Sequence, residues 1–422
     1  MKKYSPDLFS AIFLVAGTCI GGGMLALPVV TAQIGFVPSA IMMIVAWAAM
    51  TATALYLTEV GFWMRKDDAH VISMSSSLLG LPGKAIAWII YLFISYASIV
   101  AYTAGGGHLI TQAAEYLRLG ELSHGVGCII FMLLFGPIIF CSHKILGKVN
   151  SWLFYAMLAA YVIIVVLGSQ EVKPKLLERQ DWGIAALALP MLLTSFSMQT
   201  MVPSLHPYLQ HDGKSLKVAI IAGTSIALIF YLIWQFIVLG SVPVSGPHGL
   251  LEALKGGHAA THYLGKHVSN GLLEMCAHFF AFFALVTSFF GMSLGLYDFL
   301  SDGLSISKKG KGGVLLALLI IVPTLVSAIS LEKIFLLALD VSGGFGDAIL
   351  NGIMPVCMIW LGRYVYMKRA GDSYRIPSSK PVLMFVCAFF VGVLLIEVFM
   401  RTGHIPAVTD VRELDFDVNI LP

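Results

Sequence analysis

The 422-residue chain is 58% hydrophobic and only 12% charged, with a mean hydropathy of +0.87, and these values exclude an ordinary soluble protein. The net charge of +3 gives no reason to expect nucleic-acid binding, and the six cysteines contain no CxxC pair that would indicate a zinc site. We therefore expect an all-α protein that crosses the lipid bilayer many times, with no separate soluble domain, cofactor or metal.

Eleven apolar segments are candidates for transmembrane helices, because a span needs about 20 apolar residues to cross roughly 30 Å of hydrocarbon. The lysines at the start followed by an apolar run imitate a signal peptide, but the run is too long and lacks a convincing cleavage site, so we expect it to remain. The predicted spans are 8–34, 36–63, 85–115, 126–141, 149–168, 183–209, 217–240, 270–300, 313–329, 332–366 and 382–401.

The distribution of basic residues predicts the orientation. With the N-terminus inside, 17 of the 26 Lys and Arg residues fall on the inner face and nine on the outer face. By the positive-inside rule the N-terminus is cytoplasmic, and after an odd number of spans the C-terminus lies outside. No Lys or Arg lies near the middle of a predicted span, which argues against a voltage sensor or an anion pore.

The first span contains a helix break. Its sequence GTCIGGGMLALP, Gly17 to Pro28, places Gly21, Gly22 and Gly23 in a row, each costing roughly 1 kcal/mol against Ala inside a helix. Pro28 then removes a backbone donor. Broken helices at membrane depth are tolerated where they line a cavity or contact protein, and they are typical of secondary transporters.

One unwound turn suits both charged ends of an amino acid. The N–H groups of Gly21 to Gly23, at the start of the second half-helix, can bind a carboxylate. The carbonyls around Ala16 and Gly17, at the end of the first half-helix, can accept an ammonium. The alternative is close helix packing through small residues; a dinucleotide-binding loop is disfavoured because no strand precedes the glycines.

The sixth span repeats this signal. Residues 189–209, LPMLLTSFSMQTMVPSLHPYL, interrupt an apolar helix with hydroxyl and amide side chains and then place Pro203 and Pro207. Thr18 precedes Pro28 by ten residues, and Thr194 precedes Pro203 by nine. Matching interruptions predict an inverted repeat of two five-span halves, 1–168 and 183–366, with 382–401 as an additional helix. An ordinary proline kink is the alternative for the sixth span alone.

The loop 241–269 contains a small group of histidines. His258 and His262 are four residues apart, as in some zinc sites, but the glutamate of an HExxH motif is absent. We therefore expect a solvated outer loop without a metal.

At these motifs the chain resembles the hydroxy and aromatic amino acid permease family, most closely its tyrosine-specific permeases. GTCIGGGMLALP resembles the family's GTxIGxGMLALP, LLTSFSMQTMVPSL resembles TSFGFHGSVPSL, and HFFAFFALVTSFFGMSLGLYDFLSD, residues 278–302, is a third match. The resemblance covers essentially the whole chain. It implies a leucine-transporter-type fold, proton-driven uptake and an aromatic substrate. The sixth span departs from the family pattern at residues 197–201, which leaves the choice of amino acid open.

The resemblance also implies site residues. Thr18 and Gly21 to Gly23 would hold the substrate carboxylate, while Ala16, Thr194 and Ser195 would receive the ammonium. Side chains expected to contact the substrate are those of Tyr96, Tyr102, Phe196 and Gln199.

Candidates for ion coupling are few. Thr287 and Ser288 in the eighth span stand where sodium-coupled relatives of the fold complete a cation site, although such hydroxyls more often bond their own i−4 carbonyl. Buried ionisable residues are functional candidates in a bilayer, and histidine titrates closest to neutral pH. The ionisable candidates are His108, His206, His278 and Asp340. Asp340 and Asp347 flank Gly343 and Gly344, which predict an interruption of the tenth span; Glu59, Glu274, Asp298 and Glu397 are expected near span ends, where water reaches them.

The leading hypothesis is a secondary transporter in the bacterial inner membrane that imports an aromatic amino acid, tyrosine first and tryptophan next, with a proton. The alternatives within transport are a sodium-coupled or a serine/threonine-type carrier. A channel would need repeated pore-lining motifs, and an intramembrane enzyme would need a nucleophile with its base. Ser195 and His206 are eleven residues apart with no third partner. No obligate protein partner is indicated.

Overall fold

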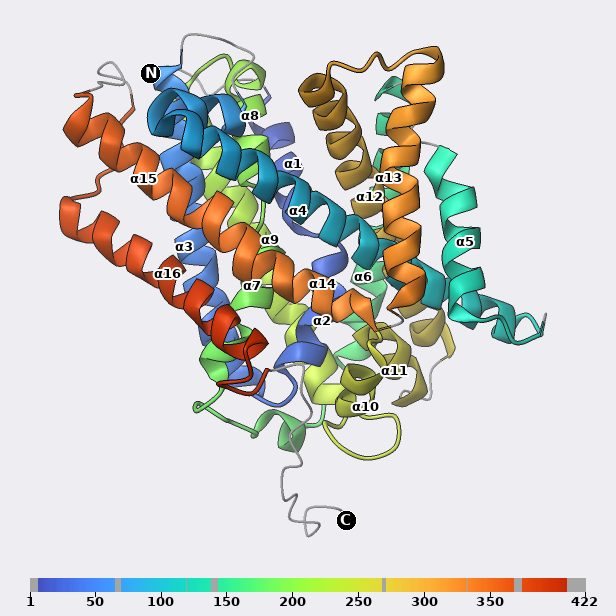
Figure 1. Ribbon diagram of the computed structural model, residues 1–422. Coiled ribbons are helices and arrows are strands. Elements are labelled where there is room, and N and C mark those ends of the chain that lie inside the picture. The colour runs from blue at the N-terminus through green and yellow to red at the C-terminus, as the bar shows by residue number, and fades with distance from the viewer. Residues whose placement is uncertain are drawn as a thin grey trace.

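The computed structural model describes residues 7–64, 70–118, 120–137, 143–267, 271–331, 333–367 and 374–407. Within these ranges the chain forms helices and no strand (Figure 1). The all-α prediction is therefore confirmed for the described residues.

Both predicted helix breaks are present. The first span consists of α1 (Leu8–Cys19) and α2 (Gly22–Thr31), bent by 50° at residues 20–21. Gly21 is extended, with φ −152° and ψ −157°, so the chain leaves helical geometry between the two halves. The sixth span is divided between residues 196 and 198, and its pieces are η3 (Ala185–Ala188), α7 (Leu189–Ser195), η4 (Gln199–Met201) and α8 (Val202–Tyr208).

The other long helices follow the predicted spans. Within the described residues, eight helical segments are long and apolar enough to cross a membrane, and the bent α1–α2 pair makes nine. Two shorter apolar helices, His124–Phe135 and Trp152–Gly168, lie where the fourth and fifth spans are predicted. The unbroken helices are α3 (Phe36–Trp63), α5 (His124–Phe135), α6 (His143–Gly168), α9 (Gly213–Ser241), α12 (Gly271–Leu304), α13 (Gly310–Ser330) and α16 (Lys380–Arg401), and α4 (Val71–Tyr116) contains a kink.

The third span begins earlier than predicted. Helix α4 starts at Val71 and turns at Gly80, whose φ of +69° lies in the left-handed region that glycine adopts at little cost. Pro82 follows, and the helix continues to Tyr116. The sequence expectation of a start at residue 85 missed the first segment because its serines hide the apolar face formed by Val71, Met74 and Leu78.

The tenth span is a wide helix. It comprises α14 (Ile334–Val341), the π-helix η5 (Ser342–Ile353), α15 (Met354–Trp360) and a second π-helical segment, η6 (Leu361–Val365). The predicted interruption at Gly343 and Gly344 is wrong, because the helix continues through both residues and only changes from α to π geometry. A Cβ on Gly343 would collide with Pro190 and Thr194 of α7, and one on Gly344 would lie 2.5 Å from Glu397 Cγ. The glycines therefore let η5 pack closely on α7 and α16.

The prediction of a solvated outer loop at 241–269 is wrong for its described part, 241–267. This segment forms α10 (Leu250–Gly256) and α11 (Ala260–His267). Leu250, Leu254 and Leu264 are buried, and the two helices pack on α2, while α11 also packs on α12. The apolar spacing within LLEALKG buries one face of a short helix, which the histidines obscured in the sequence.

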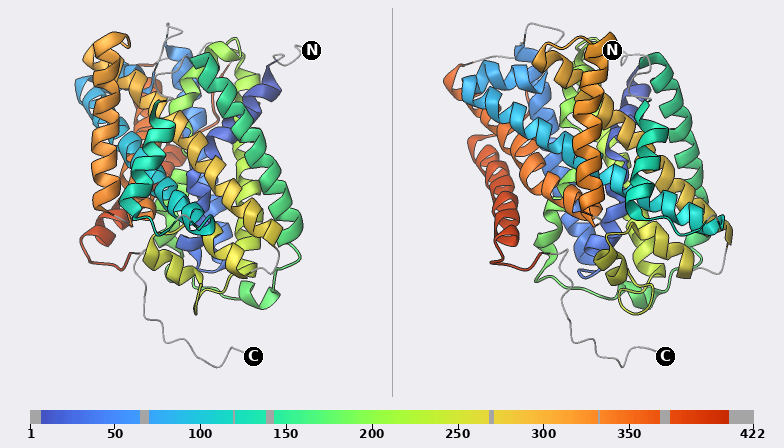
Figure 2. Two further views of the ribbon diagram at one scale, coloured as in Figure 1. Left: turned by 90° about the vertical axis from the view of Figure 1, so that its right-hand side faces the viewer. Right: turned by 45° about the vertical axis from the view of Figure 1, so that its right-hand side comes forward.

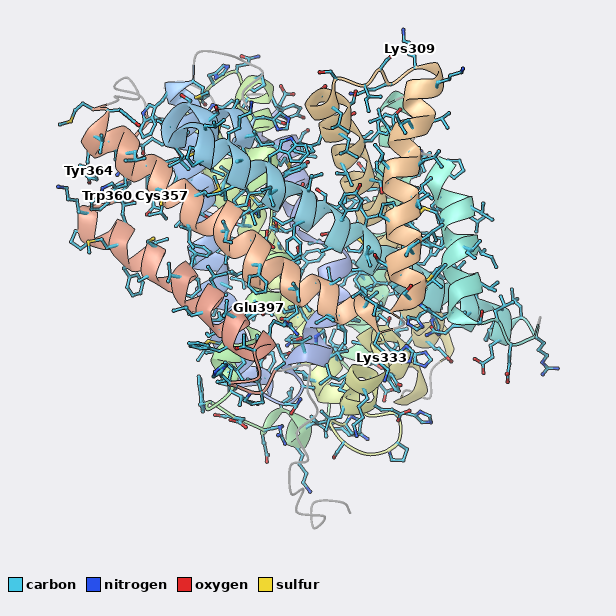
Figure 3. All side chains as sticks on the ribbon, in the orientation of Figure 1. Lys309, Lys333, Cys357, Trp360, Tyr364 and Glu397 are labelled. Atoms are coloured by element: carbon cyan, nitrogen blue, oxygen red, sulfur yellow. The ribbon has the colours of Figure 1, made fainter. Side chains whose placement is uncertain are left out.

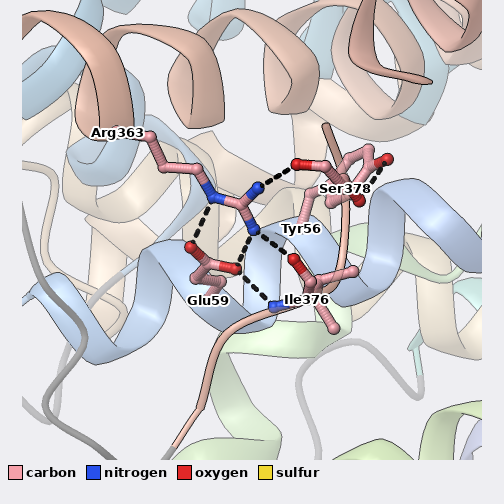
Figure 4. A network of polar contacts seen from close by, with 5 residues as sticks. All are labelled: Tyr56, Glu59, Arg363, Ile376 and Ser378. Carbon is pink, nitrogen blue, oxygen red and sulfur yellow. Dashed lines mark hydrogen bonds and ion pairs between the residues drawn. The ribbon is translucent and has the colours of Figure 1, made fainter. Parts of the chain in front are cut away.

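Glu59 and Glu397 are not open to water as expected. Glu59 is 2% exposed and pairs with Arg363 of η6, whose Nη2 lies 2.5 Å from Glu59 Oε2 (Figure 4). Arg363 also donates to the carbonyls of Ile376 and Ser378, and the Ile376 N–H donates to Glu59. A buried ion pair is retained when hydrogen bonds satisfy the remaining polar atoms, and this one fastens the segment after η6 to α3.

A second buried cluster joins the tenth and eleventh helices. Arg401, at the end of α16, donates to Asp340 Oδ2 at 2.5 Å and to Glu397 Oε1 at 2.7 Å. Glu397 (Figure 3) is fully buried against Gly344. One arginine thus neutralises part of the charge of two buried carboxylates, which places Asp340 in an ion-paired cluster.

The two broken spans run in opposite directions. Helices α1 and α8 lie in the upper half of Figure 1, whereas α2 and α7 lie in the lower half. Lys309 and Lys333 mark opposite ends of α13 (Figure 3). Helices α10 and α11 cover the lower end, and α16 lies at the periphery of the bundle (Figure 2). This arrangement brings the middle of the first and sixth spans together in the interior.

Candidate functional site

A single hydroxyl bridges the two helix breaks. Tyr231 Oη of α9 lies 2.5 Å from the Cys19 carbonyl oxygen and 2.7 Å from the Ser195 carbonyl oxygen. Cys19 ends α1, and Ser195 ends α7, so Tyr231 marks the point where both unwound turns meet. Trp234, one turn further along α9, donates from Nε1 to the Met24 carbonyl at 3.0 Å. Helix α9 thereby fixes both breaks from one side.

The first N–H group of α2, that of Gly22, points to the eighth span. The Gly22 N–H donates to Ser288 Oγ of α12 at 3.0 Å, and a Cβ on Gly21 would collide with the same hydroxyl. A Cβ on Gly22 would lie 2.5 Å from Cε1 of Tyr102. The glycines are therefore required for the close approach of α4 and α12 to the break, and a neutral hydroxyl is bound where a helix N-terminus favours an anion.

The carbonyl end of α1 is partly used within the helix. The Ala16 carbonyl accepts a hydrogen bond from the Ile20 N–H at 2.9 Å. Gly17 packs on the ring of Phe154, and a Cβ added to Gly17 would lie 3.2 Å from Cε2 of that ring. Thr18 is exposed; its hydroxyl donates to the Leu14 carbonyl and lies 2.9 Å from Met201 Sδ. Of these three predicted residues, Thr18 contacts the other broken span.

The polar side chains of the sixth span form hydrogen bonds with several helices. Thr194 Oγ1 donates to the Leu339 carbonyl of α14, and Ser195 Oγ donates to the Met191 carbonyl of its own helix. Phe196 is buried with its ring centroid 5.3 Å from that of Tyr231. Gln199 is fully buried and donates to the Met50 carbonyl at 2.9 Å, which ties η4 to α3.

The comparisons with known proteins agree with this architecture. A family model described as the tryptophan/tyrosine permease family matches residues 4–397. The chain belongs to the tryptophan/tyrosine permease family. It is 30% identical to tyrosine-specific transport system 1 of Haemophilus influenzae, over 94% of this chain and 97% of that protein. It is 27% identical to a tryptophan-specific transport protein of the same organism, over 97% and 100% of the two chains. It is 28% identical to glutamine transporter 2 of Aliivibrio fischeri, over 71% and 76%.

These relatives are transport proteins and not enzymes, so this permease family member is a transporter of amino acids with many membrane helices. The sequence resemblance to aromatic amino acid permeases is confirmed. Ser195 and His206 do not form a catalytic pair here: Ser195 Oγ donates to a backbone carbonyl, and His206 packs against Phe62 with the ring centroids 4.8 Å apart.

The ion-coupling candidates of this permease lie in different environments. Thr287 Oγ1 donates to the Phe283 carbonyl at 2.8 Å and approaches that of Ala284, so its hydroxyl is used by its own helix. Ser288 reaches the first-span break. His278 is half-buried on α12, and Asp340 is ion-paired with Arg401.

His108 belongs to a group of histidine rings contributed by α4, α5 and the turn between α10 and α11. Its ring stacks on His124 of α5 at 4.1 Å and meets His258 edge-on at 4.7 Å. A small cavity there is also lined by Gln112 and Phe335. No group of three or more His, Cys, Asp or Glu side chains within the described ranges has the geometry of a metal site.

The two tyrosines of α4 that were predicted to contact the substrate lie in different places. Tyr102 lies against the first-span break, whereas Tyr96 donates from its hydroxyl to the Leu319 carbonyl of α13 at 2.7 Å. Tyr96 therefore links two helices, and Tyr102 is the aromatic side chain of this pair that faces Gly22.

Four residues near the two helix breaks were not predicted from the sequence to bind substrate or ion: Tyr231, Trp234, Asp347 and Asn351. Asp347 Oδ1 accepts from Ser197 Oγ at 2.6 Å and from Asn351 Nδ2 at 2.6 Å. The spacing of Asp347 and Asn351, one helical turn apart beside three glycines, was the available signal. Tyr231 and Trp234 gave none, because aromatic residues in membrane helices usually only pack.

Replacing Tyr231 by Phe tests the bridge between the breaks. The variant keeps the ring and its contact with Phe196 but removes the hydroxyl that both carbonyls share. We expect substrate binding to weaken roughly tenfold, because one buried hydrogen bond contributes about 1 kcal/mol and an orphaned carbonyl costs more. Equilibrium binding of labelled tyrosine to purified protein measures this. Tyr155→Phe, an exposed hydroxyl on α6, is the control.

Proposed function

We propose that this permease imports an aromatic amino acid, tyrosine or tryptophan, by proton symport across the bacterial inner membrane. The observation that carries the proposal is the meeting of two antiparallel broken spans at Tyr231, in a chain whose relatives are named for tyrosine and tryptophan transport. The tyrosine-specific relative named above is 30% identical to this chain and the tryptophan-specific one 27%, which favours tyrosine.

In the proposed complex the substrate carboxylate replaces Ser288 Oγ as the hydrogen-bond acceptor of the Gly22 N–H. An anion gains more from a helix N-terminus than a neutral hydroxyl does, so the exchange is favourable. The Ser288 hydroxyl, once released, donates to the same carboxylate. The ammonium approaches the carbonyl ends of α1 and α7, where unwound turns supply oxygen acceptors. Tyr102 closes the site over Gly22.

The proposed mechanism moves two halves, 1–168 and 183–366, against each other, with 382–401 as a helix outside the repeat. The opposite directions of the two broken spans support this inverted repeat. Eleven spans, a cytoplasmic N-terminus and an outer C-terminus belong to the same proposal. Residues 408–422, at the C-terminal end, lie outside the described residues.

The contacts of Thr287 favour a proton over sodium as the coupling ion. A sodium site would need the hydroxyl oxygens of Thr287 and Ser288 to face the first-span break together. Thr287 is bound to its own helix, and Ser288 accepts from Gly22, so the two hydroxyls do not form a cage with α1 carbonyls in this conformation. A proton needs only one titratable group whose affinity changes as the carrier closes.

Uptake in proteoliposomes tests the proposed function. With an inward proton gradient in sodium-free buffer, we expect labelled tyrosine or tryptophan to accumulate and a protonophore to abolish the accumulation. Competition with unlabelled tyrosine, tryptophan, serine and glutamine ranks the substrates. Uptake that requires sodium, or that only glutamine or serine inhibits, would contradict the proposal.

A further inference from the structure

A buried carboxylate of η5 faces the break in the sixth span. Asp347 is fully buried, and its Oδ1 accepts hydrogen bonds from Ser197, which lies in the unwound turn between α7 and η4, and from Asn351. Asn351 Nδ2 also donates to Ser197 Oγ at 3.0 Å. The three side chains form a closed polar triangle that links the tenth span directly to the sixth-span break.

The other carboxylate oxygen is left open. Asp347 Oδ2 is buried and has no hydrogen-bond partner, and the same holds for Asn351 Oδ1. A buried polar atom normally finds a partner, so an unpartnered carboxylate oxygen at membrane depth calls for an explanation. A proton on Oδ2 removes the charge and makes this oxygen a hydrogen-bond donor.

No positive charge compensates Asp347 among the described residues that interact with it, which are Thr194, Ser197, Asn351 and Tyr102. Tyr102 is uncharged at neutral pH. The buried carboxylates on the other helices packed against η5 each have an arginine partner: Asp340 and Glu397 share Arg401, and Glu59 pairs with Arg363. Cys357 of α15 faces Cys387 of α16, and α7 carries no titratable side chain.

The surroundings fit a proton better than a metal cation. Both groups that reach Oδ1 are hydrogen-bond donors, one of them an amide nitrogen, and a hard cation requires a shell of oxygen ligands instead. The π-helix itself is a place where a helix can change register, and such segments often accompany functional sites. A change between π and α geometry in η5 would alter what Asp347 faces.

We propose that Asp347, oriented by Ser197 and Asn351, carries the co-transported proton. This inference rests on the proposed proton symport. The proton binds Oδ2 from the outer solution and leaves Oδ2 for the cytoplasm, and only this O–H bond forms and breaks. Ser197 couples protonation to substrate binding, because its hydroxyl donates to Asp347 and Ser197 belongs to the unwound turn between α7 and η4.

The test compares Asp347→Asn with wild type in proteoliposomes. We expect the variant to bind labelled tyrosine and to exchange it across the membrane at equal pH, but to lose at least tenfold in accumulation driven by a proton gradient. Asp347→Glu, which keeps the carboxyl group, should recover part of the accumulation. Asp298→Asn is the matched control, because Asp298 is an exposed carboxylate paired with Lys308 at 2.9 Å.

The possible results separate the two proposals. If wild type does not respond to a proton gradient, proton symport fails and the role of Asp347 fails with it. If wild type responds and Asp347→Asn accumulates equally well, only the assignment of Asp347 is overturned. If the folded variant has lost both binding and exchange, the carboxylate serves the substrate ammonium, which also overturns the assignment.

Ser197→Ala covers the case in which Asp347→Asn does not fold. Its hydroxyl stabilises the ionised form of Asp347, so its loss should move the pH at half-maximal transport upward by about one unit. A pH profile identical to that of wild type would overturn the proposal. Ser169→Ala, which removes an exposed hydroxyl of the outer segment after α6, is the control.

Discussion

Gly22→Ala should weaken tyrosine binding by roughly 10- to 100-fold while the protein still inserts into the membrane. The added methyl group would lie 2.5 Å from Cε1 and 2.8 Å from Cδ1 of the buried Tyr102 ring. Overpacking of this kind costs about 1–3 kcal/mol, and each 1.4 kcal/mol is a tenfold change in affinity. Displacing Tyr102 also disturbs the site proposed for the carboxylate. Equilibrium binding to purified protein is the measurement.

Gly23→Ala is the matched control for this prediction. Its Cβ would lie 3.5 Å from Ser195 Oγ, which is an ordinary contact, and Ala is a better helix former than Gly. We therefore expect binding within about threefold of wild type. Equal losses for the two variants would show that the break tolerates no side chain for reasons other than the position of Tyr102, and an unchanged Gly22→Ala would contradict the site.

Glu59→Gln should destabilise the protein by about 3–5 kcal/mol, because it leaves the Arg363 guanidinium buried without a counter-charge. The Ile376 N–H would keep an acceptor, but a weaker one. Thermal unfolding in detergent should show an apparent Tm lower by roughly 5 °C or more. The exposed pair Lys308–Asp298 provides the comparison, since Asp298→Asn should cost at most about 1 kcal/mol.

A double variant separates the charge from the packing. Glu59→Met with Arg363→Met removes both ions, so the double variant should recover part of the stability that Glu59→Gln loses. A double variant less stable than Glu59→Gln would indicate that the hydrogen bonds from Arg363 to residues 376 and 378 matter more than the charge balance.

The sequence predicted those features of the fold that have local causes. Three glycines and a proline predict the first break because each residue disfavours an uninterrupted helix, and Pro203 with the polar run predicts the second. Helices α10 and α11 were missed because their apolar faces are only one or two turns long. The water access expected for Glu59 and Glu397 was wrong because their partners, Arg363 and Arg401, lie far along the chain and only packing brings them together.

The site shows the same division between local and tertiary information. Gly22 donates a hydrogen bond to Ser288, and Tyr102 lies against Gly22; both contacts join residues far apart in the chain. The side chain of Gln199 donates a hydrogen bond to the Met50 carbonyl of α3, a contact that no local pattern indicates. The bridging role of Tyr231 depends on the position of α9 relative to both breaks, so it could not be derived from its place in a uniformly apolar helix.

A structure of the protein with bound tyrosine tests the central claim most directly. We expect the substrate carboxylate within hydrogen-bond distance of the Gly22 N–H, Ser288 Oγ released from that N–H, and the ammonium at the carbonyl ends of α1 and α7 beside Tyr231. Tyrosine bound elsewhere, for example in the cavity beside His108 and His258, with Gly22 still donating to Ser288, would contradict the account.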